Sequence, residues 1–516
     1  MDLKVLEKFD EALKNGYIKA YFQPLTRSVS GKVCGAEALA RWEDPDEGII
    51  SPAEFIGILE ENRLIHKLDL AILENVCKFY KKSKFKDLTF SVNLSRLDFK
   101  ETDMFAEITE IMSEYDVPAS AISLEITEST MLGDYEVTHK LFNKFHDAGY
   151  KIWLDDFGSG FSSLNILRNY EFDVLKIDMS LLRNFDTRSQ KIIASIINMA
   201  KMLGTHTLSE GVETDEQRDF LRDNGCEILQ GFYFSKPINE EEFTSYLEAN
   251  TSETKDEHKY WSDVGKVNFL SGDPLSSTDI SPSDNEKNDF GVAPLAFIEY
   301  DGKKITYPYV NKAYIEQVKK IGYSSVDAME EIANSEDFEY YKRFMQQIEA
   351  TINRGGIFRM DNIINDVVYT FTTKLVASGG NKHMIAATVH TISSEKSNYL
   401  ILKHNKSLYA TYDLVTEINP DKDSAIQIFS NSGFSKIYGT SSLRKGIVEF
   451  ASNEIHPDDK ERYLAFFDID TLKSRISIYI QDSFRVKKYG GDGYIQKNIR
   501  ISKLDNKKYL YTIQSV

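Results

Sequence analysis

Six oxygen-donor side chains and one lysine in the first half of the chain lie at or just after apolar runs. They are Glu37, Asn93, Glu125, Asp155, Asp156, Glu210 and Lys176. Carboxylate and amide oxygens are the ligands that Mg²⁺ or Mn²⁺ prefers, and because no histidine stands among them a zinc site is not expected. Two such ions about 3.5 to 4 Å apart clamp the attacking and leaving oxygens of a phosphoryl displacement and lower the pKa of a shared water. These residue types predict metal-dependent phosphoester chemistry.

Two of the acids stand side by side in the stretch KIWLDDFGSGFSSL, residues 151–164. Asp155 is expected to bridge two ions, and Asp156 to bind one. Because adjacent residues of a strand point to opposite faces, both carboxylates face inward only if the strand ends there. Gly158 and Gly160 would then provide the irregular turn.

Two cations complete the candidate chemistry. Lys176 is expected to orient the attacking water or to neutralise phosphate, and Arg41, four residues after Glu37, to bind a phosphate with two hydrogen bonds. Taken singly, each acid is equally compatible with a helix cap or a solvated loop, and Lys176 with a surface lysine. Their joint placement favours the metal site.

Seven short β-type runs, alternating with helix-type runs between Tyr21 and Ile238, would position these side chains. The runs are residues 33–42, 88–95, 121–129, 151–158, 174–182, 205–213 and 227–237. This alternation predicts parallel pairing, in either an open doubly wound sheet or a (β/α)8 barrel. Because distant strand ends converge on one pocket only in a barrel, the polar residues favour the barrel.

The clearest helical pattern is SQKIIASIINMAKMLG, residues 189–204, with a capping serine at its start and Gly204 at its end. The positions expected to share its apolar face are Ile192, Ile193, Ile196, Ile197, Ala200 and Leu203.

Length and composition restrict the class of protein. A chain of 516 residues predicts two to four domains. No apolar run reaches the roughly 20 residues of a membrane helix, and the N-terminal stretch lacks the features of a signal peptide, so we expect a soluble, cytoplasmic protein without membrane insertion. The net charge of −18, with no long Lys/Arg block, argues against a polynucleotide partner. The three cysteines have no CxxC spacing and predict buried thiols.

The domain organisation follows from a change of character after Pro237. We predict a barrel over residues 1–245, a Ser- and Asp-rich linker over 246–290, and two smaller domains over 291–395 and 396–516. Within the linker, WSDVGKVNFL, residues 261–270, is expected to dock on a neighbour.

The first half resembles the EAL-domain phosphodiesterases over nearly all of residues 21–238. The motifs, in the order of that family, are EALAR at 37–41, NLS at 93–95, EITES at 125–129, DDFGSGFSSL at 155–164, LKID at 175–178, EGVET at 210–214 and QGFYFSKP at 230–237. The resemblance implies a modified TIM barrel that hydrolyses the second messenger cyclic di-GMP to linear pGpG with two Mg²⁺ or Mn²⁺ ions. It also implies a homodimer formed through the barrel.

The resemblance assigns roles residue by residue. Glu37, Asn93, Glu125 and Asp155 would hold one metal, and Asp155, Asp156 and Glu210 the other. Lys176 would contact the nucleophilic water, Gln230 would line the site, and Glu213 would support Lys176 or the metal shell. Substrate contacts would come from Arg41, Gln23, Leu39, Asp178 and Pro237, and Glu128 would anchor the loop after Asp156.

The second half resembles PAS domains in two places, residues 294–324 and 454–502. PAS folds wrap a five-stranded sheet around a cavity, and they often sense ligands or pair subunits; a module without ligand that only dimerises or packs against the barrel is equally compatible. YGGDGY, residues 489–494, is interpreted as a hairpin turn rather than a diguanylate cyclase signature, because the required Glu and aromatic residue are missing. HPDD, residues 456–459, is interpreted as a helix start.

Two functional hypotheses follow. The favoured one is an active, cyclic-guanylate-specific phosphodiesterase regulated by the C-terminal modules, because every metal ligand is present. The alternative is a receptor or scaffold that binds cyclic di-GMP without cleaving it.

Overall fold

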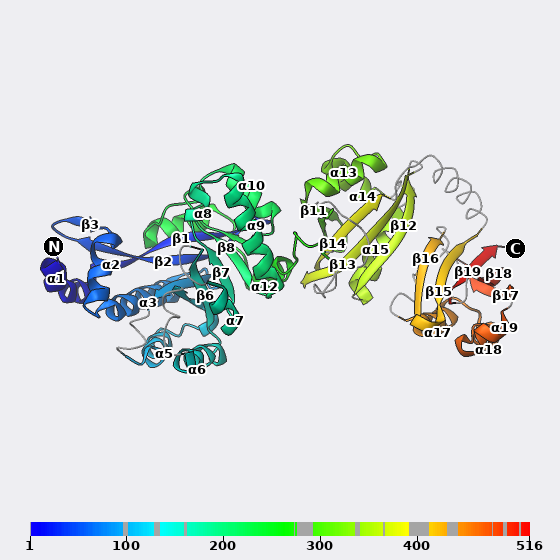
Figure 1. Ribbon diagram of the computed structural model, residues 1–516, viewed down its shortest axis with the longest axis horizontal. Coiled ribbons are helices and arrows are strands. Elements are labelled where there is room, and N and C mark those ends of the chain that lie inside the picture. Colours follow the sequence, from blue (N-terminus) through cyan, green and yellow to red (C-terminus); the bar gives the residue numbers. More distant parts are fainter. Residues whose placement is uncertain are drawn as a thin grey trace. The chain divides into compact units, whose positions relative to one another are not determined.

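The computed structural model describes residues 2–95, 102–127, 135–158, 163–272, 274–275, 293–335, 341–354, 356–364, 367–391, 412–430, 442–476, 478–488, 493–504 and 507–515. The chain divides into two compact units, Met1–Ser271 and Gly272–Val516 (Figure 1). None of the helices in the described ranges has the length and apolar character needed to cross a bilayer.

The first unit is an eight-stranded mixed barrel. Its strands are β1 (Ile18–Arg27), β2 (Val33–Asp44), β4 (Thr89–Leu94), β5 (Ile122–Thr127), β6 (Lys151–Phe157), β7 (Val174–Ile177), β8 (His206–Ser209) and β9 (Ile228–Leu229). The order β1-β9-β8-β7-β6-β5-β4-β2 closes because β1 also pairs with β2, while the short β3 (Gly48–Ile50) extends β2 at the edge. A barrel rather than an open sheet is therefore confirmed.

One strand departs from the expected parallel pairing. The seven predicted runs correspond to β2 and β4–β9, which pair in parallel with one another, but β1 is antiparallel to both β2 and β9. The reason is local: only five residues join β1 to β2, which suffices for a hairpin, whereas a parallel connection needs a crossover of a dozen or more residues.

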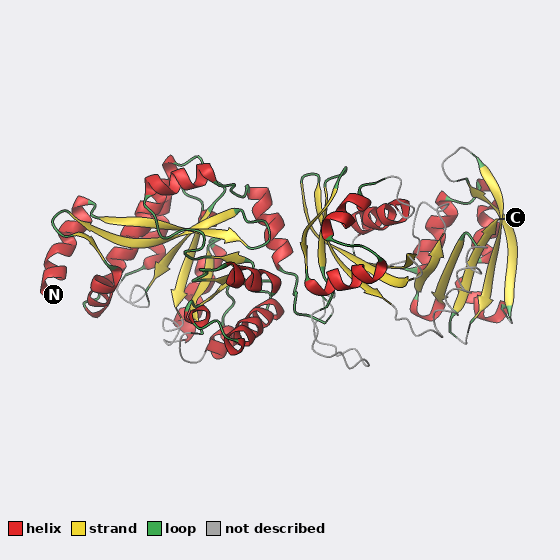
Figure 2. Ribbon diagram, turned by 90° about the horizontal axis from the view of Figure 1, so that it is seen from above, coloured by secondary structure: helices red, strands yellow, loops and turns green. Residues whose placement is uncertain are grey.

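Helices lie outside the barrel strands (Figure 2). They are α1 (Asp2–Asn15), α2 (Pro52–Glu61), α3 (Ile65–Lys82), α5 (Met104–Glu114), α6 (Tyr135–Asp147), α7 (Ser163–Asn169), α8 (Ser180–Arg183), α9 (Thr187–Met202), α10 (Asp215–Asp223), α11 (Glu240–Ala249) and α12 (Lys255–Gly265). The apolar faces of the helices from α1 to α11 and the strands form a large core, and Leu25, Cys34, Trp153, Val174, Leu208 and Ile228 form a second, smaller cluster among the strands. The three cysteines are free and buried, as predicted.

The helix predicted at residues 189–204 is present, but its first residue and its buried face differ from the prediction. Helix α9 begins at Thr187, because Asp186 rather than a serine caps it and accepts a hydrogen bond from the Ser189 N–H at 2.8 Å. Its end is as predicted, with Gly204 at φ +75°. Ile192 and Leu203 are exposed, whereas Lys201 is buried because it pairs with Glu227.

The barrel unit continues beyond the boundary predicted at residue 245. Glu253 accepts hydrogen bonds from the Arg27 guanidinium at 3.0 and 3.1 Å, and the Lys201 ammonium donates to both Glu227 and the Gly265 carbonyl. The segment from Trp261 docks on the barrel as expected, with Trp261 buried. Part of the predicted linker is therefore α12, which is held to the barrel by the Arg27–Glu253 ion pair just before it and by the Lys201 hydrogen bond at its end.

Glu227 is the centre of this attachment. Burial alone would raise its pKa, but the charge of Lys201 and a 2.6 Å contact with His206 Nδ1 lower the pKa to about 2. The carboxylate is therefore ionised at neutral pH although the side chain is fully enclosed.

The second unit contains two five-stranded antiparallel sheets. The first has the strands β10 (Ala296–Tyr300), β11 (Ile305–Val310), β12 (Ile357–Ile364), β13 (Val367–Gly379) and β14 (Lys382–Thr391), in the order β11-β10-β14-β13-β12. The second has β15 (Leu414–Asn419), β16 (Ser424–Ser430), β17 (Tyr479–Lys487), β18 (Tyr494–Lys503) and β19 (Tyr509–Ser515), in the order β16-β15-β19-β18-β17. Both sheets thus have the same topology.

In each sheet the helices are inserted between the second and third strands and pack on the sheet to form a separate core. They are α13 (Lys312–Ile321), α14 (Val326–Ala333) and α15 (Tyr341–Arg354) in the first, and α17 (Leu443–Asn453), α18 (Lys460–Phe466) and α19 (Ile469–Arg475) in the second. Pro457 lies in a short 3₁₀ turn that His456 caps, just before α18, as the HPDD pattern predicts. Residues 489–492 lie outside the described ranges, but Lys487 pairs with Tyr494, which agrees with a hairpin connection.

Candidate active site

The carboxyl ends of the parallel strands bring the predicted metal ligands to one rim of the barrel. Glu37 lies on β2, Asn93 on β4 and Glu125 on β5, where Asn93 and Glu125 are register partners. Asp155 and Asp156 lie on β6, and Lys176 on β7. Glu210 and Gln230 come directly after β8 and β9. All of them therefore face one site, although up to 193 residues separate Glu37 from Gln230.

Lys176 is at the centre of this rim and has no exposed surface. Its ammonium Nζ lies 2.9 Å from Asp155 Oδ1, 2.6 Å from Glu210 Oε1 and 3.5 Å from Glu37 Oε2, and it donates a short hydrogen bond to Glu125 Oε2. A surface lysine, the alternative considered from the sequence, is excluded.

Glu37 also accepts hydrogen bonds from two side-chain amides. Asn93 Nδ2 donates to Glu37 Oε1 at 3.1 Å, and Gln230 Nε2 donates to Glu37 Oε2 at 2.6 Å. Gln230 Nε2 also reaches Gln23 Oε1 at 3.0 Å, and Gln23 in turn donates to the Ser235 carbonyl. These hydrogen bonds fix the carboxylate orientation of Glu37.

The aspartate pair is oriented by a bulge, which differs from the predicted strand end. Strand β6 continues to Phe157, but its register with β7 shifts between Leu154 and Phe157, and Asp156 has φ +56°. An extra residue in a strand reverses the alternation of side chains, so neighbouring carboxylates can face the same site. Gly158, at φ +98°, follows the bulge; Gly160 lies outside the described residues.

The cluster carries more negative charge than Lys176 neutralises. Burial, with Asp155 and Asp178 nearby, raises the pKa of Asp156 to about 6, and burial raises the pKa of Glu210 to about 7 despite the contact with Lys176. The pKa of Glu125 lies well above its usual value, first because its carboxyl group is buried and second because of the negative charge of Glu37.

Lys176 responds in the opposite sense. Burial alone would lower its pKa, but the surrounding carboxylates, Asp155 first, raise it well above its usual value. Lys176 therefore stays protonated, and its ammonium forms ion pairs with Glu37, Glu125, Asp155 and Glu210.

The donor set fits divalent cations. Oxygen atoms of Asp155, Asp156 and Glu210 lie within 4.8 Å of one another. Glu125 Oε1 is buried without a hydrogen-bond partner, and Asp155 Oδ1 meets Lys176 as an ion pair without hydrogen-bond geometry. Hard oxygen donors with surplus negative charge and unused lone pairs are what Mg²⁺ or Mn²⁺ requires.

A groove adjoins this cluster. Leu39, Arg41 and Asn93 line it together with Asp69 and Ser95. Arg41 is half-buried, its Nη1 donates to the Ala40 carbonyl at 2.8 Å, and burial lowers its pKa. The groove places the predicted phosphate-binding guanidinium next to a predicted metal ligand.

Asp69 is a groove residue that the sequence analysis missed. Its carboxylate accepts a hydrogen bond from the Ser95 N–H at 3.2 Å. The sequence feature that could have identified it is an acidic residue on the apolar face of a helix: Asp69 is buried on α3 together with Leu68 and Ile72.

The remaining predicted residues lie around or away from the cluster. Asp178 is buried after β7, and its Oδ1 caps the Ser180 N–H at 3.1 Å. Pro237 is half-buried next to Ile238, which bridges to Phe22 beside Gln23. Glu213 is exposed and is not brought to Lys176; its N–H donates to the side chain of Gln217. Glu128 lies outside the described residues.

Comparison with known proteins places this rim in a family context. Residues 6–237 match the EAL domain family. The chain is 34% identical over 241 residues to the signaling protein YkoW of Bacillus subtilis. This match covers 46% of this chain and 30% of YkoW. It is 32% identical over 240 residues to the cyclic di-GMP phosphodiesterase RocR of Pseudomonas aeruginosa, covering 45% of this chain and 61% of RocR.

A solved structure described as PaMucR phosphodiesterase in complex with c-di-GMP is 30% identical, covers 46% of this chain and 99% of that one, and superposes with a TM-score of 0.45. The chain spans about a third of the length of YkoW and of other curated relatives such as NbdA of P. aeruginosa.

Proposed function

On the premise that the N-terminal half of this chain is an EAL domain of the cyclic di-GMP phosphodiesterase family, we propose that the protein hydrolyses cyclic di-GMP to linear pGpG. The observation that carries the proposal is the convergence of Glu37, Asn93, Glu125, Asp155, Asp156 and Glu210 around one buried lysine at the barrel rim. No member of the expected ligand set is replaced in the sequence.

The reaction adds water to one phosphorus of the cyclic dinucleotide. The bond from phosphorus to the ribose O3′ breaks, O3′ takes up a proton, and the phosphate stays on the O5′ of the other nucleoside. Two divalent ions, held by Glu37, Asn93, Glu125 and Asp155 and by Asp155, Asp156 and Glu210, would supply Lewis-acid activation of water and neutralise phosphate charge.

The chain's own residues orient the reactants. Lys176 stays protonated among the carboxylates and presents a fixed positive charge to the attacking water or the phosphate. Asn93 and Gln230 hold Glu37 in one rotamer. Arg41 and Leu39, in the adjoining groove, would contact the nucleotide. Such positioning lowers the entropic part of the barrier.

The proposal is tested with the purified full chain, cyclic di-GMP and Mg²⁺, by chromatographic detection of pGpG. Glu37→Gln should lower turnover at least about a hundredfold, because it removes one metal-binding carboxylate. Glu43→Gln is the matched control, since Glu43 lies on the same strand but bonds the Tyr21 hydroxyl at 3.0 Å, away from the cluster. Absence of pGpG at every metal and protein concentration would refute the proposal.

Metal binding has its own readout. In Asp155→Asn, the residue assigned to both ions loses a charge, so calorimetric titration with Mn²⁺ should show both sites weakened. Equal Mn²⁺ affinity in the variant and the wild type would contradict the assignment. Binding of cyclic di-GMP without cleavage would instead favour the receptor hypothesis.

We also propose that the second unit regulates the barrel through two PAS-like modules. The support is their shared strand order, 2-1-5-4-3 counted within each sheet, with helices between the second and third strands. Comparing turnover of the 1–271 fragment with that of the full chain gives the sign of regulation. A homodimer formed through the barrel stays a prediction, and sedimentation of the full chain over a range of concentrations tests it.

A further inference from the structure

Three large apolar side chains are exposed at one end of the second module, whose sheet is formed by β15–β19. Ile478, directly before β17, is 73% exposed, Tyr479, the first residue of β17, is 49% exposed, and Leu504, directly after β18, is 51% exposed. The Lys503 N–H donates to the Ile478 carbonyl at 2.8 Å, which holds the two segments side by side. The three side chains therefore lie at the same end of the sheet.

Backbone and side-chain contacts hold this end of the sheet in place. The Leu504 N–H donates to the Lys508 carbonyl at 3.0 Å, which closes the turn between β18 and β19. The guanidinium carbon of Arg500 lies 3.6 Å from the centre of the Tyr479 ring, in a cation–π contact.

Cations surround the apolar side chains. The two segments that carry them, residues 475–479 and 500–508, contain five cations and one acid, Asp505, which lies outside the described residues. One of the five cations, Lys508, is paired with Glu417 at 2.8 Å. The other four, together with the apolar residues, form a set that we call the basic tip: Arg475, Arg500, Lys503, Lys507, Ile478, Tyr479 and Leu504.

The acids of the neighbouring turn, which joins β15 to β16, already have partners. Asp421 pairs with Lys473 at 2.5 Å. Asp423 accepts a hydrogen bond from the Ser442 hydroxyl at 2.6 Å. The basic tip therefore carries a local surplus of positive charge, although the whole chain has a net charge of −18.

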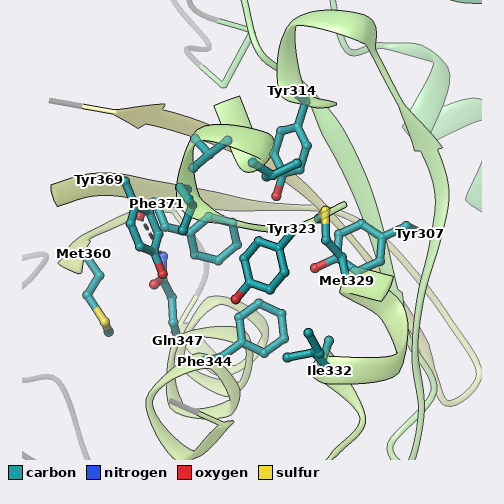
Figure 3. Close-up of a pocket in the computed structure, with 14 residues that line it drawn as sticks. Tyr307, Tyr314, Tyr323, Met329, Ile332, Phe344, Gln347, Met360, Tyr369 and Phe371 are labelled. Carbon is teal, nitrogen blue, oxygen red and sulfur yellow. Dashed lines mark hydrogen bonds between the residues drawn. The ribbon is translucent and has the colours of Figure 1, made fainter. Parts of the chain in front are cut away.

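The corresponding turn of the first module lacks this combination. It joins β13 to β14 and has the sequence SGGNK, residues 378–382, without an apolar side chain. Its cation, Lys382, is paired with Glu299 at 3.0 Å. Tyr307 and Tyr314 of that module line a space between its sheet and its helices (Figure 3), whereas Tyr479 is exposed at the tip. The basic tip is thus not a consequence of the topology that the modules share.

We propose that the basic tip binds the surface of an anionic lipid bilayer. In such contacts apolar side chains enter the boundary between head groups and acyl chains, and Lys and Arg meet the anionic head groups. A peptide partner would need a groove to receive its side chains, whereas a lipid layer receives the side chains of the tip itself. Acids farther than about 8 to 10 Å from the surface are screened at physiological salt, so the net charge of the chain does not prevent binding.

Sedimentation of the full chain with lipid vesicles tests the proposal. With about 30% phosphatidylserine in phosphatidylcholine, partition should be at least about tenfold stronger than with phosphatidylcholine alone. Raising the salt from about 0.1 M to about 0.5 M should remove most of this difference, because it screens the attraction.

Two variants place the contact at the basic tip. Lys503→Gln should weaken partition about fivefold, the factor that one cation contributes near an anionic surface. Leu504→Ser should weaken it about tenfold, because it removes a side chain that is buried on binding. The matched controls are in the first module: Lys382→Gln removes a cation and Ile357→Ser an isoleucine that is 47% exposed, and both should leave partition unchanged.

An environment-sensitive dye reports insertion directly. The three native cysteines are buried, so a thiol-reactive dye labels Leu504→Cys selectively. Its emission should shift to shorter wavelength on vesicles that contain phosphatidylserine, whereas the dye on Ile357→Cys should show no shift.

Several results would overturn the proposal: no binding to vesicles that contain phosphatidylserine, equal binding to vesicles without it, or unchanged partition in both Lys503→Gln and Leu504→Ser. Binding of a polyglutamate peptide without binding to vesicles would assign the tip to an acidic protein partner and would overturn the proposal as well.

Discussion

Replacing Lys176 with methionine tests the electrostatics of the barrel rim. Methionine keeps much of the length of the lysine side chain but removes the ammonium that meets Glu37, Glu125, Asp155 and Glu210. The side chain has no exposed surface, so water cannot take over the role of the lost charge. The variant should lose stability without metal and recover it with metal.

The size of the loss follows from the burial of the cluster. Removing one partner of a buried ion pair costs about 3 to 5 kcal/mol. Protonation offsets part of it, because the pKa of Glu210 is already raised to about 7 and the acid takes up a proton readily when Lys176 is absent. In EDTA we therefore expect the barrel to lose about 3 kcal/mol.

Divalent cations should act in the opposite direction. A ligand at a hundred times its Kd stabilises the folded state by about 2.7 kcal/mol. In Lys176→Met no ammonium competes with Mg²⁺ or repels it, so the ions should bind more tightly, and each tenfold gain in affinity adds about 1.4 kcal/mol of stabilisation. The Mg²⁺-induced gain in stability should thus be larger in the variant than in the wild type.

Tryptophan fluorescence isolates the barrel within the full chain. The protein has three tryptophans, Trp42, Trp153 and Trp261, and all are buried in the first unit. Urea unfolding followed by their emission, in EDTA and in saturating Mg²⁺, gives the four midpoints that are needed. The second unit contributes no tryptophan signal.

Lys201→Met is the matched control. Lys201 is also a buried lysine, but it pairs with Glu227 at the opposite end of the barrel from the metal ligands. It should lose a similar amount of stability and show no larger gain with Mg²⁺ than the wild type. An equal Mg²⁺ gain in Lys176→Met and the wild type, or an enlarged gain in Lys201→Met, would refute the reasoning.

Three further predictions concern backbone and charge at the barrel ends. Because the pKa of Glu227 is depressed to about 2, its contribution to stability is complete above its unfolded value of about 4.3 and falls as the pH drops. Relative to Glu227→Gln, the wild type should lose about 0.6 kcal/mol between pH 6 and pH 4, read from urea midpoints. Gly231→Ala adds a Cβ that would overlap the backbone of Val212, and it should destabilise the barrel by about 1 to 3 kcal/mol and lower turnover. Its control is Gly57→Ala, which lies in open space on α2 and should stabilise the barrel by about 0.5 to 1 kcal/mol. Gly265→Ala, whose Cβ would overlap the carboxylate of Glu227, should lower turnover and weaken Mn²⁺ binding; unchanged turnover and Mn²⁺ affinity would contradict the coupling that predicts it.

The sequence predicted the elements whose signal is local. Seven apolar runs became seven barrel strands, and the polar residues at their ends meet at one rim because parallel strands share a direction. Strand β1 is not among the seven predicted runs. Its antiparallel direction cannot be read from its own residues, because it is set by the five-residue connection to β2.

Other errors came from tertiary contacts that override local pattern. Lys201 is buried on α9 in place of Leu203 because Glu227, distant in sequence, neutralises it. The aspartate pair was expected at a strand end, but the register of β6 against β7 shifts around Asp156 instead. Such a shift depends on a neighbouring strand, so period-two reasoning on one segment cannot find it.

The same contacts connect the two ends of the barrel. Strand β9 has only two residues, so Glu227 and Gln230 are three positions apart along nearly extended chain. Glu227 is held by Lys201 and His206, and Gln230 by hydrogen bonds to Glu37 and Gln23. A segment fixed at both ends in a close-packed interior transmits a displacement rather than absorbing it. Movement of α12, which reaches Glu227 through the shared Lys201, should therefore change the orientation of the Glu37 carboxylate before it disturbs any other predicted metal ligand.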